Sequence, residues 1–203
     1  MTRVLFLGCH ADDIELGCGG TIHKNKGVWD ISCVTLSKSS FSPLGENGEH
    51  PDIWMCQKEA LSVLGVDGTW LNHRTNFFYL ERNEIYLSLV WARESIRPDI
   101  VFTQMADDHQ DHEVLAKETM RVFQSHSVIQ YHIPRSQRAF CSNYYQVLSE
   151  DDFKAKTKAL DCYPMYKEKK YFCHDFIKAQ MLSAGCYIGA DLAECFLSVQ
   201  LIN

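Results

Sequence analysis

The sequence contains little proline and glycine, 5 and 11 of its 203 residues, which excludes a collagen-like or low-complexity chain. It has no apolar run near the roughly 20 residues that a membrane-spanning helix needs, and the run at 4–7 is too short for the apolar core of a signal peptide. Basic residues are not in excess, because the formal charge is −6, whereas a nucleic-acid-binding surface is basic. We therefore expect a cytoplasmic protein without a membrane or nucleic-acid partner.

Paired cysteines are also missing. The nine cysteines are an odd number and include no C-x-x-C pair, and a chain of this length can bury a core without disulfide bonds. We expect reduced thiols, as in a reducing compartment. The composition, 46% hydrophobic and 23% charged, is that of a globular protein. Because no linker or repeat divides the chain, we expect one domain over residues 1–203.

Apolar runs of strand length alternate with helical patterns along the chain. The run at 4–10, for example, precedes a glycine-rich turn and a helical stretch to about residue 26. Such alternation predicts an α/β fold, a single Rossmann-like domain with a mostly parallel sheet and helices on both faces. A polar loop at 38–50 is long enough to act as a lid or substrate loop. The further predicted strands are 29–37, 69–73, 99–104, 128–133, 144–148 and 194–202, and the further predicted helices are 52–64, 85–96, 114–123, 150–162 and 170–183.

Two clusters of metal-ligand side chains follow predicted strands. One is H-A-D-D-I-E at 10–15, and the other is D-D-H-Q-D-H-E at 107–113. One such cluster alone is more typical of a solvated turn or a helix cap. Because the carboxyl ends of parallel strands share one sheet edge, two clusters there indicate a common site. Imidazole and carboxylate groups suit a divalent ion such as Zn²⁺. The glycines at 17, 19 and 20 do not match the dinucleotide motif G-x-G-x-x-G.

These clusters carry a family resemblance. Residues 10–21, H-A-D-D-I-E-L-G-C-G-G-T, resemble the motif A-H-P-D-D-x-E-x-G-x-G-G-T of the PIG-L/LmbE-like zinc-dependent N-deacetylases. Residues 109–112, H-Q-D-H, resemble the second motif of that family, H-x-D-H, which P-D-I-V-F at 98–102 precedes. Further similarities at Glu59, 64–65, 158–163 and 193–196 extend the resemblance over essentially the whole chain.

The resemblance implies a metal site made by His10, Asp13 and His112. It also implies that Asp12 is the general base that takes a proton from the attacking water. Adjacent Asp12 and Asp13 side chains point in different directions, so one can bind the metal while the other faces the water. Zinc lowers the pKa of bound water to about 7 and polarises an amide carbonyl. Two imidazoles and one carboxylate also accept Fe²⁺ or Co²⁺.

The resemblance assigns two further catalytic residues. His109 corresponds to the histidine that, as an imidazolium, stabilises the oxyanion or protonates the leaving amine. Asp111 corresponds to the carboxylate that orients and charges this histidine. An acid is needed because an amine anion is a poor leaving group, and a histidine beside carboxylates keeps its proton near pH 7.

The resemblance points more weakly to substrate-binding residues. Arg74 corresponds to an arginine that many members place near the substrate, although a surface salt bridge is an equal alternative. Asn143 and Tyr144 lie where the family often lines its pocket, and a place in the core is equally consistent.

Several positions depart from the family pattern. Cys56 and Ala184 stand where arginines are common, and Met165 and Tyr166 replace a frequent Ser-Gln pair. The loss of two cationic positions and of a polar pair predicts a substrate that is less anionic or more apolar than a typical acetylated sugar nucleotide.

Together these observations predict a zinc-dependent amidohydrolase that removes an N-acetyl or other small N-acyl group. The expected partner is a small-molecule N-acylated substrate, an amino sugar or glycoside. Two alternatives remain open at this point, an amidase acting on a non-sugar amine or a modified base, and a non-hydrolytic metal-binding relative. Homo-oligomerisation also remains open.

Overall fold

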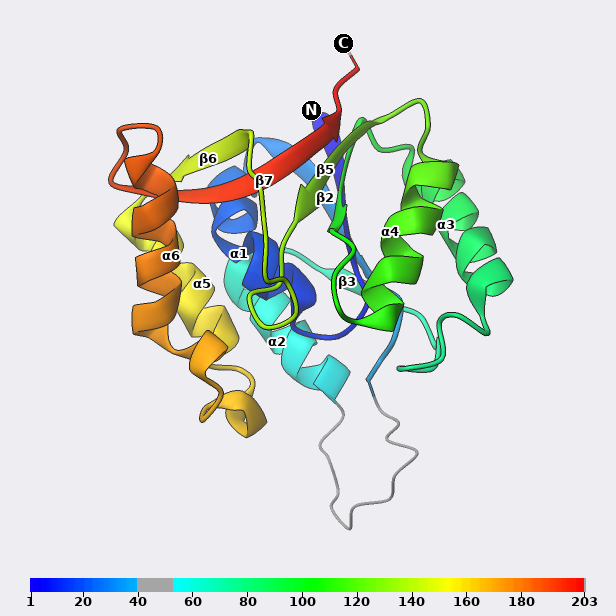
Figure 1. The fold of residues 1–203 in the computed structure, drawn as a ribbon, viewed down its shortest axis with the longest axis horizontal. Coiled ribbons are helices and arrows are strands. Elements are labelled where there is room, and N and C mark those ends of the chain that lie inside the picture. The colour runs from blue at the N-terminus through cyan, green and yellow to red at the C-terminus, as the bar shows by residue number, and fades with distance from the viewer. Residues whose placement is uncertain (40–52, 203) are drawn as a thin grey trace.

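The computed structural model describes residues 1–39 and 53–202, so most of the loop predicted as a lid lies outside the described residues. They form a seven-stranded sheet in the order β3-β2-β1-β4-β5-β7-β6 (Figure 1). Strands β1 to β5 run parallel, and β7 pairs antiparallel with both β5 and β6. The strands are β1 (Thr2–Gly8), β2 (Trp29–Thr35), β3 (Gly68–Trp70), β4 (Ile100–Gln104), β5 (Ser127–Tyr131), β6 (Tyr144–Leu148) and β7 (Leu192–Gln200).

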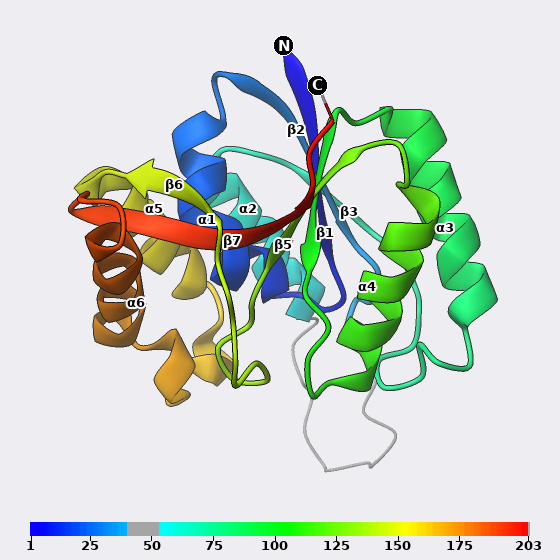
Figure 2. The same cartoon turned by 45° about the horizontal axis from the view of Figure 1, so that its top comes forward.

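Helices cover both faces of this sheet. Figures 1 and 2 show α1, α2, α5 and α6 on one side and the pair α3 and α4 on the other. The helices are α1 (Asp13–Asn25), α2 (Ile53–Leu64), α3 (Arg82–Ile96), α4 (Gln110–Val122), α5 (Glu150–Leu160) and α6 (His174–Cys186). The predicted single α/β domain with a mostly parallel sheet is therefore confirmed.

The central strand β1 divides the core between the two layers. Its side chains alternate between the faces, as strand geometry requires. Val4 and Phe6 belong to the apolar cluster that includes residues of α1, α2, α5 and α6. Leu5 and Leu7 belong to the cluster that includes residues of α3 and α4. Because β1 is buried on both faces, its sequence is a continuous apolar run rather than an alternating one.

The glycines of α1 allow close packing rather than nucleotide binding. A Cβ atom at Gly17 would collide with the ring of Tyr131, and one at Gly20 would lie 2.6 Å from Leu148 Cδ1. The carboxylate of Glu194 on β7 accepts hydrogen bonds from the backbone N–H groups of Gly20 and Thr21, at 3.0 and 2.8 Å. The last strand is thus attached to the helix that follows the first cluster.

The predicted elements are present with shifted ends. The helix predicted at 170–183 begins as a short 3₁₀ turn, Lys170–Phe172, and α6 then starts at His174. The last strand starts at Leu192, two residues earlier than predicted. All nine cysteines are free thiols. Within the described residues, no helix combines the length and apolarity that a membrane crossing requires.

Candidate active site

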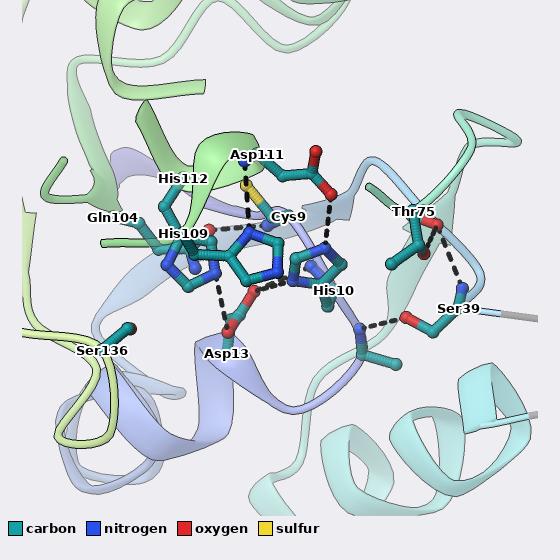
Figure 3. Close-up of polar contacts among 12 residues, drawn as sticks. Cys9, His10, Asp13, Ser39, Thr75, Gln104, His109, Asp111, His112 and Ser136 are labelled. Carbon is teal, nitrogen blue, oxygen red and sulfur yellow. Dashed lines mark hydrogen bonds and ion pairs between the residues drawn. The ribbon is translucent and has the colours of Figure 1, made fainter. Parts of the chain in front are cut away.

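Two neighbouring parallel strands bring the predicted clusters together. Strands β1 and β4 are hydrogen-bonded neighbours, so their carboxyl ends lie at the same edge of the sheet. His10 follows β1, and Asp13 is the first residue of α1. His112 lies in the first turn of α4, which follows β4. Figure 3 shows these three side chains pointing toward one another although about a hundred positions separate His112 from the other two in the sequence.

Carboxylates fix the orientation of both imidazoles. His10 donates from Nε2 to Asp111 Oδ2 at 3.0 Å, and His112 donates from Nδ1 to Asp107 Oδ2 at 2.7 Å. The remaining ring nitrogens face Asp13, with His10 Nδ1 at 3.4 Å from Oδ2 and His112 Nε2 at 3.8 Å from Oδ1. Metal-binding histidines in proteins are commonly held by such carboxylate contacts on the opposite nitrogen.

The donor set fits a divalent cation of the zinc type. Two groups of side chains bring one ligand atom each to within 4.8 Å of one another, namely Cys9, Asp13 and His112, and His10, His109 and Asp111. Burial raises the pKa of Asp13, but the charge of His112 and the hydrogen bonds to His10 outweigh it, and the pKa falls below its usual value. Nitrogen donors with an ionised carboxylate are ligands that Zn²⁺ accepts.

Proton binding at His10 reflects the same negative surroundings. Burial alone would lower the pKa of this imidazole, but hydrogen bonds with Asp111 and Asp13 raise it to about 10. A proton and a metal cation therefore compete for Nδ1 of His10, next to the Asp13 carboxylate.

His109 caps helix α4. Its Nδ1 accepts the backbone N–H of Asp111 at 3.2 Å. The Asp111 carboxylate contacts His10, and it also accepts the backbone N–H groups of Asn76 and Phe78 at 2.6 and 3.2 Å. Its oxygens thus bond to His10 and to these two backbone donors, so its place beside His109 includes no side-chain hydrogen bond between the two among the described residues.

The protonation of His109 differs from the sequence-based expectation. Burial and the charges of His10 and His112 lower the pKa of His109 to about 4. Its imidazole is therefore neutral at pH 7. Because Nδ1 accepts a hydrogen bond, the single ring proton lies on Nε2.

Asp12 has a strained backbone. Its φ of 125° lies in the region that favours glycine, and it is the N-cap of α1 without a side-chain capping bond. Non-glycine residues adopt such conformations at a cost of about 1–3 kcal/mol, and they concentrate at functional sites. Burial and the neighbouring Asp13 raise the pKa of the Asp12 carboxyl well above its usual value. The carboxyl is thus free of the helix cap and is a stronger base than an exposed aspartate.

These side chains open into one cavity of about 610 Å³. His10, Asp12, Asp13, His109 and His112 all line it. Leu16 of α1 and Asp108 also line the cavity. The other lining residues come from the segment 75–76, the loop after β5 and the turns between α5 and α6, and they include Asn76, Arg135, Ser136, Arg138, Tyr166, Lys169 and Tyr171.

The three predicted substrate-binding residues lie elsewhere. Arg74 pairs with Glu81, lies over the ring of Phe77 and lines a different hollow. The side chain of Asn143 bonds both backbone groups of Ser198 on β7. Tyr144 packs against Phe196, with ring centroids 6.1 Å apart. None of the three lines the cavity: Arg74 forms a salt bridge, Tyr144 packs against the core, and the exposed Asn143 bonds the backbone of β7.

The residues that sequence reasoning missed are those around the two motifs. Asp107 was visible only as one of several acids beside His109, and its hydrogen bond to His112 depends on the fold. Cys9, directly before His10, lies within the ligand distances above, and its backbone N–H donates to Gln104 Oε1 at 2.6 Å. Arg135 and Lys169 belong to no motif, so nothing in the sequence assigns them to the cavity.

Fold and site together define an α/β protein with a candidate metal centre at the carboxyl edge of its sheet. Residues 5–123, more than half of the chain, match the family model of PIG-L, described as GlcNAc-PI de-N-acetylase. The chain therefore belongs to the PIG-L family.

Individual relatives agree with this assignment. The chain is 28% identical over 167 residues to the uncharacterized deacetylase YaiS of Escherichia coli (strain K12), covering 77% of this chain and 88% of that protein. Its fold is similar to that of the conserved protein TT1542 from Thermus thermophilus (23% identity, TM-score 0.82, 100% and 97% of the two chains). It is also similar to that of N,N'-diacetylchitobiose deacetylase from Pyrococcus horikoshii (19% identity, TM-score 0.77, 96% and 82%).

Proposed function

We propose that this protein is a metal-dependent hydrolase that removes an acetyl or other small acyl group from an amine, with an amino sugar or glycoside as its substrate. The observation that carries the proposal is the orientation of His10 and His112. Two carboxylates hold their outer nitrogens, so that the inner nitrogens face Asp13 at the floor of a cavity. Family membership and the deacetylase relatives support the same chemistry.

The metal ligands in this proposal are His10, Asp13 and His112. When bound, Zn²⁺ would polarise the acyl carbonyl and make a nucleophilic water available at neutral pH. Fe²⁺ and Co²⁺ are compatible with the same donors. The buried Cys9 thiol lies within the same ligand distances of Asp13 and His112, so it is an alternative third ligand.

Asp12 is the proposed general base. It lines the cavity next to the ligand Asp13, and its raised pKa brings it closer to the working pH, where a base is most effective. Asp12 takes one proton from the attacking water as the water oxygen bonds to the acyl carbon. It then returns that proton to the amine nitrogen as the carbon–nitrogen bond breaks, so that the products are a carboxylic acid and an amine.

His109 is proposed to stabilise the oxyanion rather than to supply the proton. Its neutral imidazole carries the proton on Nε2, and the ring lines the same cavity. An N–H donor directed at the developing negative charge is worth several kcal/mol in acyl transfer, about 2.7–4 for one donor. Asp111 acts through His10 in this scheme, because its carboxylate holds the His10 ring.

We also propose a cytoplasmic location and a single deacetylase domain over 1–203. The nine free thiols suit a reducing compartment. The sheet, whose last strand β7 bonds to α1, supports a domain that includes both ends of the described chain.

Acetate release from a panel of N-acetylated sugars and amines, with metal content assayed in parallel, tests the proposal. We expect Asp12→Ala to keep its metal and lose most of its turnover, and His112→Ala to lose its metal. His174→Ala is the matched control, because His174 is exposed, pairs with Asp161 and lies outside the cavity. Near-normal kcat in Asp12→Ala would show that the base is assigned wrongly, and full metal content in His112→Ala would show the same of the metal ligand.

A further inference from the structure

Three cationic side chains lie at the cavity that holds the proposed catalytic residues. Arg135 and Arg138 come from the loop after β5, and Lys169 comes from the turns between α5 and α6. These segments lie more than thirty positions apart in the sequence, and the fold brings them to one wall. Substrate entering the cavity passes a positively charged surface.

Arg138 differs from the other two cations. Its guanidinium forms an ion pair with Asp108, with Nε and Oδ2 3.0 Å apart. Among the described residues, no carboxylate lies within ion-pair distance of Arg135 or Lys169. Within residues 1–39 and 53–202, these two cations of the cavity therefore have no carboxylate at ion-pair distance.

Lys169 is held in place by aromatic rings. Its ammonium lies 3.3 Å from the ring centroid of Tyr166 and 5.7 Å from that of Tyr171. Burial lowers the pKa of Lys169, Asp12 raises it, and Arg135 lowers it further. The ammonium therefore interacts electrostatically with both the proposed base Asp12 and the second cation Arg135.

The acidic residues of the cavity do not neutralise the positive charges of Arg135 and Lys169. Asp12 and Asp13 line the cavity, but the proposed divalent cation would offset both of them. Asp108 is already paired with Arg138. Among the described residues, the exposed Arg135 and the half-buried Lys169 then remain as two positive charges that line the cavity, and such charges attract an anion from solution or substrate.

The structure also weakens one part of the expectation of a less anionic substrate. Two of its grounds were Cys56 and Ala184, which replace arginines of the family pattern. Neither residue lines the cavity, since Cys56 packs against the core and Ala184 is buried in α6. The other ground was the replaced polar pair, of which Tyr166 does line the cavity.

We infer that the substrate carries a negatively charged group, a phosphate or a carboxylate, near its acylamino group, and that Arg135 and Lys169 bind this group. The inference rests on the proposed hydrolase function and adds to it the charge of the substrate. Arg135 supplies a planar guanidinium that can donate two parallel hydrogen bonds to either anion. Lys169 supplies the compact positive charge of its ammonium group, which interacts with Asp12.

Paired substrates test this inference. Acetate release is measured with N-acetylglucosamine, its 1-phosphate, its 6-phosphate and the carboxylate N-acetylmuramic acid. We expect kcat/KM for at least one anionic member to exceed that of neutral N-acetylglucosamine by tenfold or more. In Arg135→Gln and Lys169→Gln this advantage falls by about tenfold through KM, because the loss of kcat/KM is larger for the anionic substrate than for neutral N-acetylglucosamine. Lys167→Gln, an exposed cation outside the cavity, keeps the advantage.

Product binding separates this inference from the proposed function. Calorimetry with glucosamine, its 1- and 6-phosphates and muramic acid does not depend on turnover. If no substrate releases acetate but an anionic amine binds in a manner that needs Arg135 and Lys169, the charge inference holds and the hydrolase proposal fails. Turnover without any preference for anionic substrates, or equal losses for neutral and anionic ligands in both variants, would overturn the inference alone.

Discussion

Asp107 Oδ2 accepts a hydrogen bond from Nδ1 of His112 at 2.7 Å. The same carboxylate accepts the Ser136 hydroxyl at 2.6 Å and the backbone N–H of His109 at 2.8 Å. Burial raises the pKa of Asp107, but the hydrogen bond and charge of His112 outweigh it, so the pKa is lowered and the group stays ionised. Asp107 therefore sets the tautomer of His112 and leaves Nε2 available toward Asp13.

This contact predicts the effect of removing Asp107. We expect Asp107→Ala to bind Zn²⁺ 10–100-fold more weakly, because His112 loses the partner that orients its ring. Competition with a metal chelator measures the affinity. Asp108→Ala is the control, because Asp108 is exposed and pairs with Arg138 instead. Equal zinc affinities in Asp107→Ala and the unmodified protein would contradict the orientation role.

The buried ion pair between Lys156 and Glu194 predicts a large stability effect. Nζ and Oε1 lie 2.6 Å apart, both side chains are only 5% exposed, and Lys156 also donates to the Leu16 carbonyl. Glu194→Gln leaves an uncompensated buried ammonium, so we expect the free energy of unfolding to fall by about 3–5 kcal/mol. Urea denaturation measures it.

A double mutant gives the sign of the coupling. Lys156→Met combined with Glu194→Gln removes both charges, so its loss of stability should be smaller than the sum of the two single losses. Lys154→Met, which breaks the exposed pair with Asp151, should change stability by less than about 1 kcal/mol. Additive losses would mean that the two charges do not interact in the folded protein.

The packing of α1 on β5 predicts intolerance at Gly17. A methyl group there would collide with the Tyr131 ring, which is itself anchored by a hydroxyl hydrogen bond to the Leu7 carbonyl at 2.6 Å. We expect Gly17→Ala to lose about 1–3 kcal/mol in chemical denaturation. Gly27→Ala, whose Cβ would meet no atom within 4 Å, should stay within about 0.5 kcal/mol of the unmodified protein. Similar values for the two variants would contradict the packing argument.

The N-terminus of α5 predicts a pH-dependent contribution from Asp152. Its carboxylate completes a capping box with Ser149 and accepts His23 Nδ1 at 2.7 Å. Burial raises the pKa of Asp152, but the His23 hydrogen bond and the Ser149 bonds outweigh it and lower the pKa below its unfolded value. The stabilisation is therefore complete above about pH 4 and is lost as the pH falls through the folded pKa.

Urea denaturation at pH 7 and pH 3 measures this contribution. Asp152→Asn should cost about 1 kcal/mol at pH 7, and the difference from the unmodified protein should shrink at pH 3. The exposed neighbour Asp151 is the control, since Asp151→Asn should change little at either pH. A pH-independent deficit in Asp152→Asn would show that the carboxylate charge makes no contribution.

Much of the fold was predictable from the sequence because β1 and β4 are apolar runs followed by helical patterns. Both motifs could be placed at one sheet edge for the same reason. The partners of individual carboxylates were not predictable. Asp111 lies two residues from His109 but bonds His10, because side-chain direction depends on the packing of α4 against the segment that supplies the Asn76 and Phe78 N–H groups.

The residues that line the cavity could not be predicted from the sequence either. Arg135 and Lys169 line the same cavity because the chain leaves β5, crosses to β6 and returns through α5. Sequence spacing does not predict which residues such a path brings together. Arg74, by contrast, has its carboxylate partner Glu81 seven positions away, so a local ion pair explains it.

The conformation of Asp12 places two kinds of selection in opposition. Glycine would adopt a φ of 125° without steric strain, so Asp12→Gly should raise the free energy of unfolding while it removes the proposed base. Directed evolution for thermal stability alone would therefore select Asp12→Gly and an inactive enzyme, unless acetate release were also screened in every round. A mutational scan scored separately for thermal survival and for hydrolysis should show its widest disagreement at position 12.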